Sequence, residues 1–69
     1  MLQANHAKVA WDSKKKHWEV TIEVGTEAIK RWSAATGREA GDAALQAMAI
    51  ETARDEGYEL GVDRVSIQR

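Results

Sequence analysis

The sequence predicts a small α+β protein in which an antiparallel sheet carries one alanine-rich helix on one face. Two observations lead to this prediction. Every second residue in 7–11 and in 18–24 is apolar, and most of the residues between them are polar, which is typical of strands with one buried face. Residues 38–56 instead repeat alanine at helical spacing. We expect the element order β-β-β-α-β, with β-β-α-α-β as the alternative.

The first two strands are expected to form a hairpin. Between them lies the polar stretch Asp12-Ser13-Lys14-Lys15-Lys16, whose composition is typical of a turn. A four-residue loop over 13–16 gives a register that suits both faces of the hairpin. That register pairs Trp11 with Trp18, Val9 with Val20 and Ala7 with Ile22 on one face, and His6 with Glu23 and Asp12 with His17 on the other.

Residues 28–36 fit two structures. As a helix, they would begin after Thr26 as N-cap and stop at Gly37. As a strand, they would pair back on residues 18–24. A three-residue turn would then set Trp32 opposite Val20 on the inward face, whereas a two-residue Gly25-Thr26 turn would leave Trp32 on the outer face. We favour the strand, because a hairpin of two strands is marginal alone and a third strand widens the support for the helix.

The helix is expected to run from Arg38 or Glu39 to Glu56, with Gly57 at its C-terminal end. Glu39 and Asp42 would lie in its first turns, where negative charge is favourable. Its inward side is predicted from the alanine spacing as Ala40, Ala43, Ala47 and Ile50, with Ala44 and Met48 beside them. Such small residues allow close approach to a sheet whose three Trp residues supply the bulk.

A short last strand is expected near the C-terminus. Val65 and Ile67 would point inward, and Arg64, Ser66 and Gln68 outward, at an edge of the sheet. We expect residues 1–69 to form one domain, because that length suits a single small core. Residues 1–5 are expected to be a frayed N-terminus.

Composition excludes several classes of protein. The chain has 69 residues, a net charge of −1 and no cysteine, which rules out disulfide bonds, thiolate metal sites and a cysteine nucleophile. It has no run of about 18 apolar residues that could span a membrane, and its N-terminal residues do not resemble a signal peptide. We therefore expect a cytoplasmic protein. Of its 30 apolar residues, 12 are alanine. Because alanine buries little surface, the core of a chain of this length is expected to give only marginal stability, which favours self-association.

No catalytic, cofactor-binding or metal-binding residues are predicted. The sequence contains no Gly-x-Ser-x-Gly, no phosphate-binding glycine loop and no third ligand near either histidine. One cluster points to nucleic acid, because basic and aromatic residues together can hold phosphate and stack on a base. The candidate contacts are Lys14, Lys15, Lys16 and His17, extended by Lys30 and Arg31 if the third strand lies beside the second.

The run Thr36-Gly37-Arg38-Glu39-Ala40, with Ala43-Ala44 and Ala47-Met48-Ala49 after it, follows two or three predicted strands. This order resembles the C-terminal half of a double-stranded-RNA-binding domain, which implies three antiparallel strands followed by a helix. That family grips phosphates with a lysine cluster at the helix start. Here Glu39 and Asp42 follow Arg38, so no RNA contact is carried over. The family's first helix also has no counterpart, and we assign the chain to no family.

The leading functional prediction is a non-enzymatic binding or regulatory module that acts through protein–protein contacts, with a second copy of the chain among its candidate partners. It rests on the absence of a catalytic constellation together with the small core. The alternative prediction is binding of RNA or DNA through the basic hairpin loop.

Overall fold

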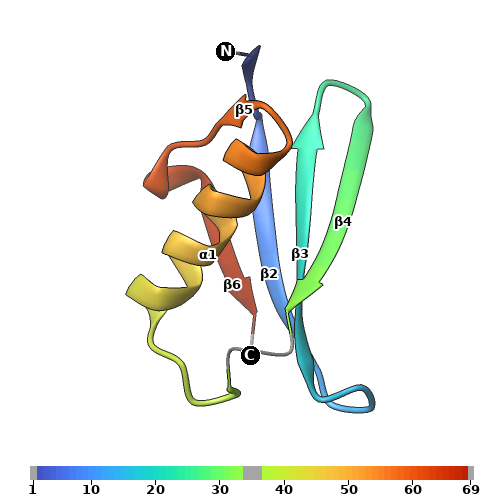
Figure 1. The fold of residues 1–69 in the computed structure, drawn as a ribbon, viewed down its shortest axis with the longest axis vertical. Coiled ribbons are helices and arrows are strands. Elements are labelled where there is room, and N and C mark those ends of the chain that lie inside the picture. Colours follow the sequence, from blue (N-terminus) through green and yellow to red (C-terminus); the bar gives the residue numbers. More distant parts are fainter. Residues whose placement is uncertain (1, 34–36, 69) are drawn as a thin grey trace.

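The computed structural model describes residues 2–33 and 37–68 (Figure 1). Four strands form the main sheet in the order β4-β3-β2-β6, and β1 and β5 form a small separate pair. The predicted class, a mixture of strands with one helix, is therefore confirmed. The predicted order is matched in part, because β1 and β5 are additions to it. In chain order the elements are β1 (Leu2–Gln3), β2 (His6–Asp12), β3 (His17–Val24), β4 (Glu27–Ser33), α1 (Asp42–Asp55), β5 (Tyr58–Glu59), the short 3₁₀ turn η1 (Val62–Arg64) and β6 (Val65–Gln68).

The hairpin of β2 and β3 has the register that the sequence predicts. All five expected pairs are present, from His6 with Glu23 at one end to Asp12 with His17 at the other. Trp11 and Trp18 meet edge to face across the strands, with ring centroids 5.2 Å apart. Trp18 is fully buried, and its indole nitrogen donates to the carbonyl of Gly37. The inward pattern of large residues was therefore sufficient to fix this pairing.

Residues 27–33 form strand β4, so the helical alternative is wrong for this segment; residues 34–36 lie outside the described part. Val24 pairs with Glu27, which makes the turn two residues long and excludes the three-residue register. Gly25 has a φ of +61°, a value that glycine adopts without strain at the first central position of such a turn. As a consequence Trp32 lies on the outer face of the sheet and Arg31 on the inner face.

Helix α1 begins at Asp42, later than the predicted start at Arg38 or Glu39. Gly41 is its N-cap, and Glu39 lies outside the helix, whereas Asp42 occupies the first turn as expected. The predicted C-terminal stop is confirmed. Gly57 has a φ of +87°, and its N–H donates to the carbonyl of Arg54.

The buried side of α1 differs from the predicted one. Leu45, Ala49 and Ala53 are fully buried, whereas the expected inward residues Ala43 and Ala47 are exposed. Ala44 is exposed as well, and Ala40, Met48 and Ile50 are half-buried. The correction has a simple cause. Alanines lie around most of this helix, so their spacing does not indicate which side is buried. The one leucine of the helix, Leu45, gains far more free energy from burial than an alanine, and the side that carries it therefore faces the sheet.

Strand β6 pairs with β2 in parallel, with Ala7 opposite Val65 and Val9 opposite Ile67. The prediction of a purely antiparallel sheet is wrong on this point, although the edge position is correct. Because α1 crosses the sheet once between β4 and β6, the last strand has to run in the same direction as β4 and β2 (Figure 1). Val65 and Ile67 pack against the core as predicted.

The N-terminal segment pairs with the connection after the helix. β1 and β5 form a short parallel ladder, in which Leu2 lies opposite Tyr58. The N–H of Ala4 donates a hydrogen bond to the carbonyl of Glu59, and the Ala4 side chain is buried, so this segment is attached to the rest of the fold. Neither strand is predicted from the sequence. No helix among the described residues is long and apolar enough to cross a membrane.

One core forms between α1 and the inward face of the main sheet. Trp18 is its largest fully buried side chain and fills the space that the small helix residues leave. The buried residues are Ala4, Ala7, Val9, Trp18, Val20, Ile22, Leu45, Ala49, Ala53 and Leu60. All of the inward strand residues in this set belong to β2 and β3, so β4 and β6 are left as the less buried borders of the sheet.

Candidate binding surface

The sheet has a second face, which points away from α1 and which we call the open face. Because side chains alternate along a strand, it carries the residues that separate the buried positions. These residues are His6, Lys8, Ala10 and Asp12 of β2, His17, Glu19, Thr21 and Glu23 of β3, Ala28, Lys30 and Trp32 of β4, and Ser66 and Gln68 of β6. Most of them are polar, as expected for a face in contact with water.

Trp32 is the exception on the open face, because it is a large aromatic side chain that is 69% exposed. Its ring stacks on the imidazole of His17, with ring centroids 5.8 Å apart and an interplanar angle of 12°. His17 is only 9% exposed. The two residues are diagonal neighbours, since Trp32 lies directly opposite Glu19. The stack holds the indole in place through one of its faces, and the other face remains open to solvent.

The basic loop, residues 13–16, lies at the same end of the sheet and is held by Asp12. One carboxylate oxygen of Asp12 accepts the backbone N–H groups of Lys14 and Lys15, at 3.0 and 3.1 Å. Its carbonyl accepts the N–H of Lys16, whose φ is +56°. The backbone hydrogen bond from Lys15 is the largest cause that lowers the pKa of Asp12. The three lysines are exposed on a loop with a defined backbone.

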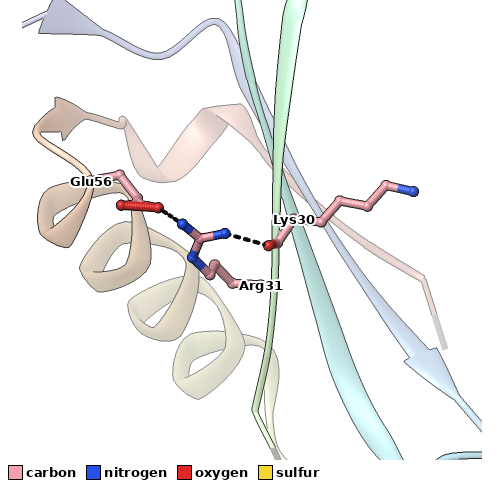
Figure 2. Close-up of polar contacts among 3 residues, drawn as sticks. All are labelled: Lys30, Arg31 and Glu56. Carbon is pink, nitrogen blue, oxygen red and sulfur yellow. Dashed lines mark hydrogen bonds and ion pairs between the residues drawn. The ribbon is translucent and has the colours of Figure 1, made fainter.

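Lys30 and Arg31 lie on opposite faces of the sheet (Figure 2). The Arg31 guanidinium reaches toward α1 and forms an ion pair with Glu56, the residue that caps that helix. It also donates from Nη1 to the carbonyl of Lys30, at 2.8 Å. The Lys30 side chain points away from the helix. Of this predicted pair, therefore, only Lys30 shares the open face with Trp32.

The opposite end of the open face carries a group of polar contacts. His6 lies between two strands, with Nε2 2.9 Å from the hydroxyl of Ser66 and Nδ1 3.8 Å from a carboxylate oxygen of Glu23. These contacts engage the polar groups with one another, as is usual on a solvated sheet face. The end that carries Trp32 is the one with apolar surface left over.

A shallow depression of about 330 Å³ lies beside the basic loop. It is lined by Ala10, Trp11, Asp12, Ser13, Lys14 and Glu19. Over residues 2–33 and 37–68, no group of three or more His, Asp or Glu side chains is close enough together to hold a metal ion. Three large apolar side chains of the described residues are exposed, Leu2, Trp32 and Val62, and Trp32 is the aromatic one among them.

The six candidate nucleic-acid contacts do not form one patch. Lys14, Lys15 and Lys16 are together on the loop, and Lys30 lies further along the open face. His17 is covered by Trp32, and Arg31 is engaged with Glu56 on the other side of the sheet. Trp32 is not among the site residues predicted from the sequence. The sequence Gly25-Thr26 does indicate its exposure, because a two-residue turn at these positions places Trp32 on the outer face of the sheet.

No family model, curated protein or solved structure matches this chain.

Proposed function

We propose that this protein is a non-enzymatic binding module that acts through protein–protein contacts, and that Trp32 anchors its contact surface. The observation that carries the proposal is the 69% exposure of an indole already held in place by His17. At that exposure, Trp32 forgoes most of the roughly 150–250 Å² that a buried aromatic side chain removes from water. Trp is among the residues that most often dominate the energy of protein interfaces. A ring held before binding also loses less side-chain freedom when a partner covers it.

The charges around Trp32 favour a protein partner over nucleic acid. Glu19 lies directly opposite Trp32 on the neighbouring strand, where its carboxylate would repel a phosphate. Arg31, the cation next to Trp32 in sequence, points to the other face and is paired with Glu56. Mixed polar surroundings of this kind are usual at the rim of a protein interface.

Binding of single-stranded nucleic acid is the second candidate. It is supported by the open face of the Trp32 ring and by the exposed basic loop at the same end of the sheet. Base stacking on an aromatic ring beside a cationic groove is the usual basis of such binding. It would be lost on reversing the charges of Lys14 and Lys16 and would weaken steeply with salt.

One experiment separates these candidates. A photoreactive phenylalanine analogue is placed at position 32 in the full chain, and after irradiation in the producing cells the adducts are identified by mass. The same analogue at Val62, which is 53% exposed on another part of the molecule, is the control. We expect protein adducts at position 32 and not at position 62. Nucleic-acid adducts would favour the second candidate, and equal labelling at both positions would contradict a contact surface at Trp32.

A further inference from the structure

Strand β4 has one unpaired edge within the part of the chain that the structure describes. The two-residue turn decides which of its backbone groups face that edge. Val24 and Glu27 close the turn as a hydrogen-bonded pair, so alternate residues of β4 direct their N–H and C=O groups toward β3. Ala28, Lys30 and Trp32 therefore direct theirs outward. The contact from Arg31 to the Lys30 carbonyl agrees with this assignment, since that carbonyl is available to a side chain.

We infer that β4 pairs in antiparallel fashion with β4 of a second copy of this chain, about a two-fold axis at Ile29. This inference rests on the proposed function and names the partner of the same surface. In a two-fold pair of identical strands, the residue at the axis faces itself and its neighbours exchange symmetrically. An axis at Ile29 sets Ala28 opposite Lys30 of the partner subunit, with both backbones offering outward groups.

Charge selects this register over the other registers. With the axis at Ile29, Glu27 of each copy faces Arg31 of the other, so two opposite-charge pairs form on the helix side. An axis at Lys30 or at Arg31 would put two like charges directly opposite each other. An axis at Ala28 would move Arg31 opposite the partner's turn residue Gly25, beyond the end of its strand.

Side chains on both faces suit the same register. Ile29 is half-buried at the border of the core, and an Ile29 pair across the axis would cover its remaining apolar surface. On the open face, Trp32 comes opposite Thr26 in the turn of the other copy, where the free face of its ring can be covered. The two sheets then join edge to edge, with both helices on the same side.

Arg31 has a second role in this arrangement. In the single chain its guanidinium occupies the Lys30 carbonyl at the centre of the edge, which protects that edge from unselective pairing. Pairing requires this carbonyl for the partner's Ala28 N–H, so the guanidinium has to release it. Its five donors allow it to keep Glu56 while it binds the partner's Glu27. A pairing that displaces an existing contact should be reversible and dependent on concentration.

Sedimentation equilibrium of the full chain tests the register through a charge swap. Glu27→Arg and Arg31→Glu should each raise the dimer dissociation constant about tenfold, because each puts like charges opposite in both pairs. An equimolar mixture of the two variants should recover dimerisation, since the mixed pair restores both attractions. Glu51→Arg, which reverses a charge at an exposed position of α1 away from the β4 edge, is the control and should leave the constant unchanged.

The outcomes are separable from those of the cross-linking experiment. A mass of one chain at every concentration would overturn the inference, and so would equal weakening of the mixture and the single variants. Cross-links from position 32 to another protein would then still support the proposed function. Thermal unfolding of each variant shows whether it is folded. Arg31→Glu also removes the ion pair with Glu56 and could unfold the chain for that reason, in which case the Glu27→Arg result alone tests the register.

Discussion

Single residues determine how the candidate surface is presented. Gly25 allows the two-residue turn, and that turn places Trp32 on the open face and Arg31 on the helix side. His17 then supports the indole by stacking. At the neighbouring hairpin, Asp12 holds the basic loop through backbone N–H groups. Each of these effects is local, and each depends on one or two side chains.

The pH dependence of stability tests the role of Asp12. The pKa of Asp12 is lowered from its ordinary value of 3.8, first by the backbone hydrogen bond from Lys15. A carboxylate with a lowered pKa stabilises the fold above its unfolded value, and the contribution is lost as the pH falls through the folded value. The difference in the free energy of unfolding between the protein and Asp12→Asn should therefore be constant from about pH 5 to 7. It should shrink as the pH falls below 3.8, the ordinary pKa of an Asp side chain.

Urea unfolding at several pH values measures this difference. Asp55→Asn, which removes one exposed carboxylate from the helix, reports the general effect of a lost negative charge. A difference between the protein and Asp12→Asn that stays the same down to pH 2 would show that the ionised carboxylate does not hold the loop.

The elements differ in how far the sequence determined them. The β2–β3 register was predictable because both faces of the hairpin agreed on one alignment, and a slip of one residue would have exposed the buried set including Trp18. The turn into β4 left two registers open, since the position of Trp32 was not fixed by hydrophobicity. The alanine spacing predicts the wrong side of α1, because alanines lie around most of the helix and burial of Leu45 decides which side faces the sheet.

Two matched substitutions test the corrected side of α1. Ala49→Leu inserts a larger side chain into a fully buried position and should destabilise the protein by about 1–3 kcal/mol. Ala47→Leu makes the same change at an exposed position and should shift stability by less than about 0.5 kcal/mol. Chemical denaturation measures both. The reverse order of effects would restore the side predicted from the alanine spacing.

At the scale of the whole molecule, the sheet is asymmetric. Its inward face and its two central strands contain the core, whereas no other described element covers the open face or pairs with the outer edge of β4. The parallel direction of β6 follows from the single crossing of α1, a constraint of topology that no short stretch of sequence displays. The candidate site was missed for a related reason, because exposure of Trp32 becomes visible only when the strands are assembled.

We infer that two copies of this protein pair through the β4 edge, next to Trp32. Amide hydrogen exchange of the full chain, followed by NMR at increasing protein concentration, tests it most directly. The outward N–H groups of Ala28 and Lys30 should exchange more slowly as concentration rises, while the N–H of Val62 should not change. Exchange at Ala28 and Lys30 that is independent of concentration, or slowing confined to another part of the chain, would contradict pairing through the β4 edge.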